Sequence, residues 1–197
     1  NALPSVSAGS DATHCNGSST TLGASGADGY SWSPSTDLSA TNIANPVASN
    51  TSTLTYTVTG TDANGCVATD AVVVTVNSNP TVSITGNTSI CSGNSTDFTA
   101  TGSGGAPTYT YLWSNGGTNP TETFSSAGTY NVTLTDNNAC TIASSRTLSV
   151  QAQPSIFIQP QDGADVCVGG TPAVLHVSAM GSNLQYQWQS ANTMSGT

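Results

Sequence analysis

Five cysteines are the side chains whose type and spacing point most directly to chemistry in this chain. They are Cys15, Cys66, Cys91, Cys140 and Cys167. The first, third and fifth are separated by two equal intervals of 76 residues, which indicates a tandem repeat. A pair of thiols can bind a metal or form a disulfide. Zinc binding is disfavoured, because no two cysteines have the C-x2-C spacing of structural zinc sites and both histidines are isolated.

Groups that could catalyse a reaction are few and scattered. Neither His14 nor His176 has a nucleophile placed near it in the sequence. Glu122 is the only glutamate, so acid–base catalysis by a pair of carboxylates would have to use an aspartate as well. We therefore predict that the chain has no catalytic site and no resident cofactor.

Calcium is the one metal for which the acidic residues offer candidate ligands. The stretch Asp62–Gly65 (DANG) resembles the start of a calcium-binding loop, but it lacks the other carboxylates and the distal glutamate of an EF-hand. A hairpin turn is the favoured interpretation of these residues. A calcium ion between domains remains an alternative, with Asp11, Asp97 or Asp162 as donors.

The composition excludes several classes of partner. The chain has one basic residue, Arg146, against ten acidic residues, and its formal net charge is −9. Nucleic-acid binding needs clusters of Lys and Arg that neutralise phosphates, so we predict no nucleic-acid partner. Attraction to an anionic membrane surface fails for the same reason, and no apolar run approaches the roughly 20 residues of a spanning helix. Ser and Thr supply 61 of the 197 residues, so they must cover the surface in place of charged side chains.

Landmarks that recur around the cysteines divide the chain into three units. Each unit opens on Pro-Ser or Pro-Thr with alternating apolar residues, and then has a cysteine, a glycine within three residues of it, and a tryptophan. We predict repeats at residues 1–78, 79–152 and 153–197, of which the third is incomplete. The links 77–80 and 151–154 both end in proline, which favours stiff, extended joints and a rod-like array.

Strand patterns within the units indicate antiparallel sandwiches. Residues 53–59 and 129–135 alternate Thr with apolar residues, as strands with one buried face and one solvated face do. Each is followed by a turn that begins with Asp and by a closing strand, at 67–76 or 141–150. Further strands are expected at 19–24, 29–33, 95–101, 108–114, 173–179 and 184–189. No segment has a helical period, so the predicted fold class is all-β, with tandem antiparallel β-sandwich domains.

Large aromatic residues fall at equivalent positions in the units. Trp32, Trp113 and Trp188 each follow the cysteine of their unit, and Tyr56 and Tyr130 lie in the alternating strands. Aromatic residues at repeated positions are typical of a sandwich core, so all five are predicted to be core residues. Exposed tryptophans would instead be able to stack on sugars.

Longer motifs resemble a known type of repeat. They lie at 30–39, 45–48 and 56–66 in the first unit, and at 90–93, 113–116 and 127–136 in the second. These segments resemble the Ig-like or PKD-like modules of large secreted surface proteins of Bacteroidota, which occur in gliding-motility adhesins and other cargo of the type IX secretion route. The resemblance covers essentially the whole chain. It implies Ig-like/PKD-like sandwiches outside the cell, at the bacterial cell surface, and it names no ligand.

A secreted location implies disulfides, for which two pairing schemes are open. Pairs within each unit, Cys15 with Cys66 and Cys91 with Cys140, would each close a loop of about 50 residues and stabilise a domain by roughly 4 kcal/mol. Cys167 would then be unpaired in this segment. Bridges between neighbouring units are the alternative, because a plain immunoglobulin topology places the two cysteines of a unit at opposite ends, and a disulfide needs Cα atoms within about 7 Å. We predict pairing within units.

These features predict structural spacer or stalk repeats of a secreted cell-surface adhesin or fibre. The partners would be neighbouring repeats of the same long chain or other copies in a fibre, with surface glycans as an alternative. A second hypothesis is a subunit of a self-assembling extracellular filament, in which the incomplete third unit accepts a strand from a neighbour. A third is a carbohydrate-binding accessory module of a secreted hydrolase, which aromatic side chains exposed in one plane would favour.

Overall fold

The computed structural model describes residues 2–159, 174–181 and 184–189, and every regular element among them is a β-strand. The predicted all-β class is thereby confirmed. Contacts between Cα atoms group the described chain into two compact units. One unit runs from the start of the chain to Thr85 and adds Thr99–Glu122 and Tyr130–Arg146; the other contains Gly86–Phe98, Thr123–Thr129 and the described residues from Thr147 onward.

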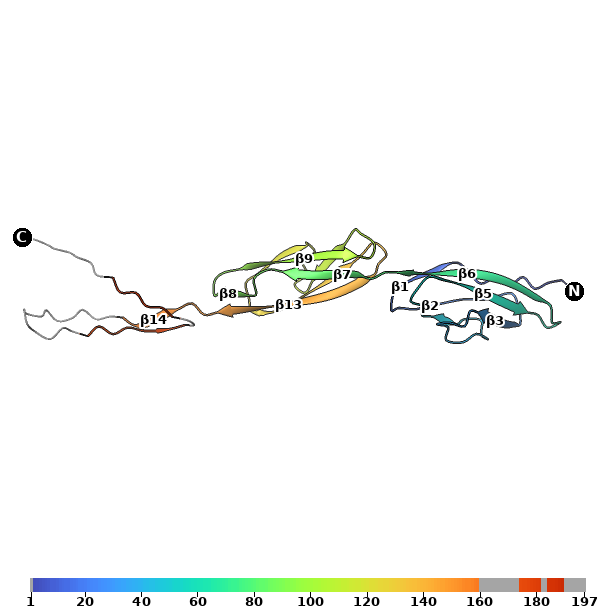
Figure 1. Ribbon diagram of the computed structural model, residues 1–197, viewed down its shortest axis with the longest axis horizontal. Helices are drawn as coiled ribbons and strands as arrows, with labels where there is room; N and C mark the ends of the chain where they lie inside the picture. The colour runs from blue at the N-terminus through green and yellow to red at the C-terminus, as the bar shows by residue number, and fades with distance from the viewer. Residues whose placement is uncertain (1, 160–173, 182–183, 190–197) are drawn as a thin grey trace, which may run out of the picture. The chain divides into compact units, whose positions relative to one another are not determined.

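Six strands lie in residues 1–78, the segment predicted as the first repeat and called the first repeat below. They are β1 (Ala12–Cys15), β2 (Thr20–Thr21), β3 (Gly29–Ser33), β4 (Val47–Ala48), β5 (Leu54–Thr61) and β6 (Val67–Asn77). Four of them form one sheet in the order β1-β6-β5-β3, and β2 pairs with β4 in a separate sheet. β5 is antiparallel to both of its neighbours, whereas β1 runs parallel to β6 (Figure 1).

The alternating sequence of β5 builds the core of this repeat. Tyr56 and Val58 are fully buried, and Thr55, Thr57 and Thr59, which alternate with them, are not. They pack with Trp32 of β3, which is 3% exposed. The polar tips of both rings are paired, because Trp32 Nε1 donates to Ile43 O and Tyr56 Oη donates to Thr36 O, each at 2.9 Å. The rings therefore bury a large apolar area without leaving a polar atom unpaired.

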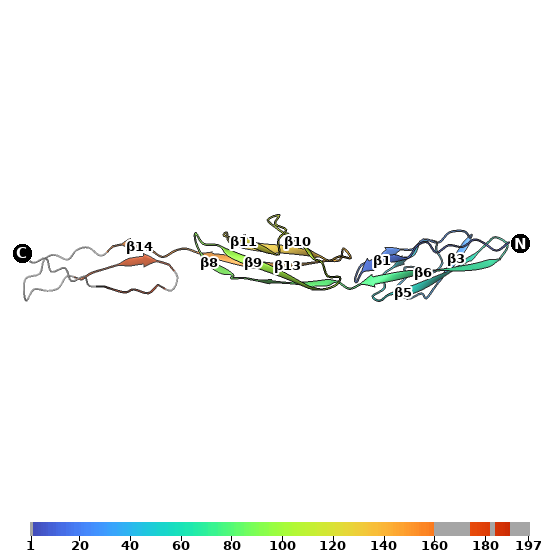
Figure 2. The same cartoon turned by 90° about the horizontal axis from the view of Figure 1, so that it is seen from above.

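Residues 79–152, predicted as the second repeat and called the second repeat below, have a similar plan with seven strands. They are β7 (Pro80–Thr85), β8 (Ser89–Cys91), β9 (Thr96–Gly104), β10 (Thr110–Trp113), β11 (Thr121–Phe124), β12 (Gly128–Thr135) and β13 (Thr141–Gln151). They form two sheets, β10-β12-β13-β8 and β11-β9-β7. As in the first repeat, the short strand that ends at a cysteine, here β8, runs parallel to the last strand, β13 (Figure 2). Trp113 is 1% exposed and Tyr130 is half-buried.

The described residues of 153–197, the segment predicted as the third repeat and called the third repeat below, contain β14 (Ser155–Ile158) and β15 (Ser178–Met180), which pair antiparallel. The strand expected at 184–189 is not formed. Trp188, predicted as a core residue, is 55% exposed. β14 and β15 are the only strands described in this repeat, and no second sheet among the described residues covers that side chain.

Candidate functional site at the joint between the first two repeats

The end of β1 forms one half of a joint. Because β1 is parallel to β6, Cys15 is the register partner of Asn77, the last residue of β6. Asn16 N donates to Asn77 O at 2.9 Å, and Asn79 Nδ2, in the link to the next repeat, donates to Asn16 O at 2.8 Å. These hydrogen bonds hold the chain corner after Cys15 against the link.

The turn between β12 and β13 forms the other half, and Asp136 organises it. Its Oδ2 accepts from Ala106 N, and its Oδ1 accepts from Asn138 N and Cys140 N, all at 2.9 Å. The hydrogen bond from Ala106 is the largest cause that lowers the pKa of the Asp136 carboxyl below its ordinary value; desolvation opposes it, and the other two hydrogen bonds add to it. A buried carboxylate thus fixes the backbone that presents Cys140.

A disulfide between Cys15 and Cys140 closes the joint, with their Cα atoms 5.6 Å apart. Both residues belong to the same compact unit of the chain. Gly105, directly after β9, has a φ of 58°, and a Cβ added there would contact Asp136 Oδ2 and approach Pro80 N to 3.1 Å. The loop at Gly105 is therefore packed so closely against the link at Pro80 and the turn at Asp136 that glycine is required at position 105.

The predicted bridge between Cys15 and Cys66 is wrong, and the direction of β1 is the reason. Cys15 lies beside Asn77 at the end of β6, whereas Cys66 directly precedes its first residue, Val67. The 11 residues of β6 separate the two positions. At about 3.3 Å per residue this is roughly 35 Å, far beyond the reach of a disulfide of about 7 Å between Cα atoms.

The predicted bridge between Cys91 and Cys140 is wrong for the same reason. Cys91 pairs in register with Gln151 at the end of β13, and Cys140 precedes the start of that 11-residue strand. The thiols of Cys66 and Cys91 are both free. Cys66 is half-buried, and Cys91 is exposed. Cys167 lies outside the described residues.

The carboxylates named as calcium donors make internal hydrogen bonds. Asp11 accepts a backbone N–H of β6 at 2.8 Å, and Asp97 accepts a threonine hydroxyl of β11 at 2.6 Å. Asp62 accepts two backbone N–H groups of its own turn at 2.9 and 2.8 Å. Asp162 is not among the described residues. In the part of the chain that the structure describes, no group of three or more His, Cys, Asp or Glu side chains could hold a metal ion.

Three supporting side chains of the joint were missed at the level of sequence. They are Asn79, Asp136 and His14, whose Nδ1 lies 2.9 Å from Cys15 O. Two sequence patterns could have identified Asn79 and Asp136. Both units have an aspartate four residues before the second cysteine, and both links have an amide side chain directly before the proline. A repeated polar residue next to a repeated cysteine indicates a shared backbone geometry.

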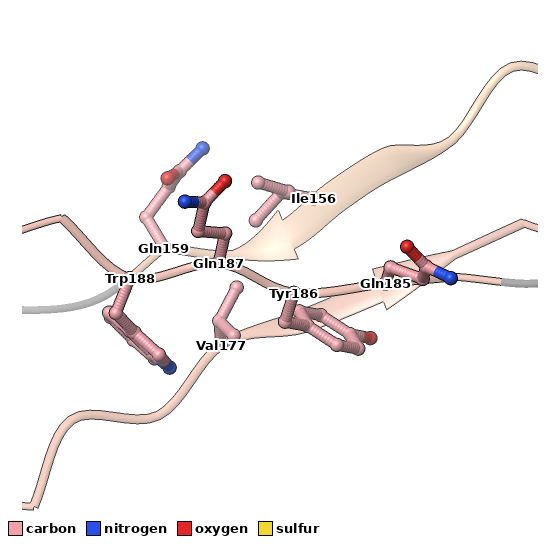
Figure 3. A pocket seen from close by; sticks show the side chains of 7 residues that line it. All are labelled: Ile156, Gln159, Val177, Gln185, Tyr186, Gln187 and Trp188. Carbon is pink, nitrogen blue, oxygen red and sulfur yellow. The ribbon is translucent and has the colours of Figure 1, made fainter.

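A shallow pocket in the third repeat is a second candidate site. It is lined by Ile156, Gln159, Val177, Gln185, Tyr186, Gln187 and Trp188. Tyr186 and Trp188 are each 55% exposed, and Figure 3 shows their rings on the same side of the chain, with the side chain of Gln187 on the other. Exposed aromatic rings would favour sugar stacking. However, the residues equivalent to Trp188 in the first two repeats are buried in cores, so this face corresponds to the inner face of a sandwich.

Comparison with known proteins identifies the type of domain. Residues 77–152 match the family described as PKD domain. The first eight Ig domains of Down syndrome cell adhesion molecule superpose with a TM-score of 0.63 at 15% identity, covering 92% of this chain and 28% of that chain. The I67–I69 I-band fragment of titin has a TM-score of 0.42 at 14% identity, covering 98% of this chain and 86% of that chain. Drosophila OTK extracellular domains 3–5 have a TM-score of 0.43 at 14% identity, covering 75% and 60%.

None of the curated proteins matches this chain. The chain spans 28% of the length of the adhesion-molecule structure, and at 15% identity the likeness shows the fold alone. Residues 77–152 thus match the PKD domain family, and the fold is an all-β, Ig-like/PKD-like sandwich. Its predicted origin in Bacteroidota and its export by the type IX route stay predictions. Within the described residues, no helix has the length and apolarity that crossing a bilayer requires.

Proposed function

We propose that this chain consists of spacer repeats from the stalk of a secreted cell-surface adhesin or fibre, with repeats at residues 1–78, 79–152 and 153–197. The observation that carries the proposal is the disulfide between Cys15 and Cys140, which joins consecutive repeats across their link. Short links between domains normally permit relative motion. A bridge and a side-chain hydrogen bond at the same link oppose that motion, as a stalk that holds a distal region away from a surface requires.

The composition supports a location outside the cell. Disulfides persist in oxidising compartments and are rare in the cytosol. Lysine is absent and Arg146 is the only arginine, so trypsin-like proteases have a single site to cut. The match of residues 77–152 to the PKD domain family is consistent with the same role.

Nuclear magnetic relaxation tests whether the bridge stiffens the joint. We compare the oxidised chain with the double variant Cys15→Ser/Cys140→Ser, and use Cys66→Ser as the matched control, because that thiol is free. In the oxidised chain and the control, backbone amides of the first two repeats should report one common rotational correlation time. In the double variant the two repeats should tumble separately, with shorter times. Independent tumbling in the oxidised chain itself would refute the spacer proposal.

A further inference from the structure

Three asparagines of this chain, Asn16, Asn64 and Asn115, are followed directly by glycine. Asparagine is a chemically labile residue, and glycine after it favours internal attack, because the glycine nitrogen reaches the side-chain amide without a Cβ in the way. All three asparagines are exposed, and each lies in a tight turn. They differ in whether the attacking nitrogen is already engaged in a hydrogen bond.

In two of the three turns the glycine nitrogen is held. Gly65 N donates to Asp62 O at 3.0 Å, and Gly116 N donates at 2.9 Å to the carbonyl of the last residue of β10. The side chain of Asn115 is held as well, because its Oδ1 accepts from Gly117 N at 3.0 Å. Attack at either site therefore has to break a main-chain hydrogen bond first.

The turn that follows Cys15 leaves its glycine nitrogen open. Ser18 N closes this turn by donating to Cys15 O at 2.9 Å, one residue beyond Gly17. Neither Gly17 N nor the side-chain amide of Asn16 makes a hydrogen bond to any residue that the structure describes. A Cβ added at Gly17 would meet no atom within 4 Å, so both reacting groups lie in open space.

We infer that Asn16 is a site of spontaneous modification, and that the modified residue loosens the joint between the first two repeats. Gly17 N gives up its proton and attacks Asn16 Cγ; a C–N bond forms, and the side-chain nitrogen leaves as ammonia. Water then opens the succinimide ring that results. Breaking the new C–N bond gives aspartate, whereas breaking the original main-chain bond gives isoaspartate. The reaction consumes one water and needs no oxidant or other reagent.

Asn16 lies where this change affects the joint. Its N–H donates to Asn77 O at 2.9 Å, and its carbonyl accepts from Asn79 Nδ2 at 2.8 Å. In isoaspartate the main chain has one more carbon before Gly17, inside the turn that Ser18 closes, so the closing hydrogen bond loses its geometry. The carbonyl that accepts from Asn79 becomes part of a free carboxylate. This inference concerns the joint alone and does not depend on the proposed stalk function.

The second repeat has the same turn with a serine in the place of the asparagine. Ser92 is followed by Gly93, whose φ is 89°, and Asn94 N closes the turn by donating to Cys91 O at 3.0 Å. The turn therefore forms without an asparagine at this position. Asn16→Ser is accordingly a matched control, which should keep the joint intact while it removes the reactive amide.

Ageing followed by peptide mapping tests the choice of site. The oxidised wild-type chain and Asn16→Ser are incubated in mildly alkaline buffer, and mass spectrometry then measures conversion at each asparagine. The wild-type chain, reduced and unfolded in guanidinium chloride, gives a reference rate for each site and so removes the influence of neighbouring residues. Relative to this reference, Asn16 should react roughly five-fold faster than Asn64 or Asn115, the factor that one net hydrogen bond supplies.

Hydrogen exchange tests the effect on the joint. Aged wild-type chains that carry isoaspartate at position 16 are identified by methylation with an isoaspartyl carboxyl methyltransferase. In these chains the amide of Ser18 should exchange faster than in the fresh protein, because its hydrogen bond to Cys15 O is lost. Asn16→Asp adds a negative charge but no main-chain carbon, so this variant should keep the protection of Ser18.

Three results would overturn the inference. Asn64 or Asn115 reacting as fast as Asn16, relative to the unfolded reference, would show that the turn hydrogen bonds do not select the site. Methylation of aged Asn16→Ser to the wild-type level would place the reaction elsewhere in the chain. Unchanged exchange of Ser18 in the modified chains would show that the joint does not respond. None of these results bears on the Cys15–Cys140 bridge, so the spacer proposal would stand in each case.

Discussion

Removing the bridge at the joint should destabilise both of the first two repeats. The perturbation is the double variant Cys15→Ser/Cys140→Ser, which removes both sulfurs of the disulfide. If each bridge stapled a single repeat, the loss of Cys15 would weaken the first repeat alone. A bridge across the link instead lowers the conformational entropy of the unfolded state of either repeat, so its loss should destabilise both.

The structure sets the size of the effect. The bridged residues are 125 positions apart, and the link divides that separation about equally. When one repeat unfolds while the other stays folded, the bridge and the link close a loop of about 60 residues, for which the chain-entropy model gives about 4 kcal/mol. For domains of this size, such a loss lowers Tm by about 15 °C or more.

Differential scanning calorimetry of the oxidised proteins measures the change, and fluorescence assigns it. Trp32 and Trp113 lie in the cores of different repeats, so versions that keep only one of them report one repeat each. The matched control is Cys66→Ser/Cys91→Ser, which removes two free thiols and should leave both transitions in place.

Two results would refute this reasoning. One is a double variant in which only the transition of the first repeat falls. The other is a control that destabilises the repeats as much as the double variant does. Either result would mean that the joint is not held by the Cys15–Cys140 bridge.

Two further predictions concern the core and the turn at Cys140. Trp113→Ala should cost roughly 3–5 kcal/mol in urea denaturation, because the ring is 1% exposed, whereas Trp188→Ala, at 55% exposure, should leave the curve unchanged; equal effects would contradict the difference in burial. The pKa of Asp136 is lowered, with the Ala106 N–H as the largest cause, so its carboxylate stabilises the fold above the ordinary pKa of about 3.9, and this contribution is lost as pH falls through the lowered folded-state pKa. Asp136→Asn should therefore flatten the acid limb of a stability profile measured from about pH 6 to pH 2, and an unchanged slope would show that this carboxylate has the same pKa in the folded and unfolded chain.

Local patterns in the sequence were sufficient to predict the long strands β5, β6, β12 and β13, but not the short strands β1, β4, β8 and β11. Residues 54–61 form β5 because threonine alternates with apolar residues there, and a strand with that pattern buries one face. The turn at Asp62–Gly65 follows from an aspartate that accepts neighbouring N–H groups and a glycine that takes a positive φ. These interactions connect residues close in sequence, so a single sequence contains the information they need.

The pairing of the cysteines was decided only by tertiary structure. Cys15 and Cys66 have counterparts in Cys91 and Cys140, and this spacing favoured bridges within units without excluding bridges between them. The deciding feature is the parallel pairing of β1 with β6, which places Cys15 beside Asn77 and about a full strand length from Cys66. Such pairing depends on hydrogen bonds between segments some 60 residues apart, and no local pattern encodes its direction. Trp188 makes the same point, since a tryptophan at a core position is buried only where a second sheet covers it.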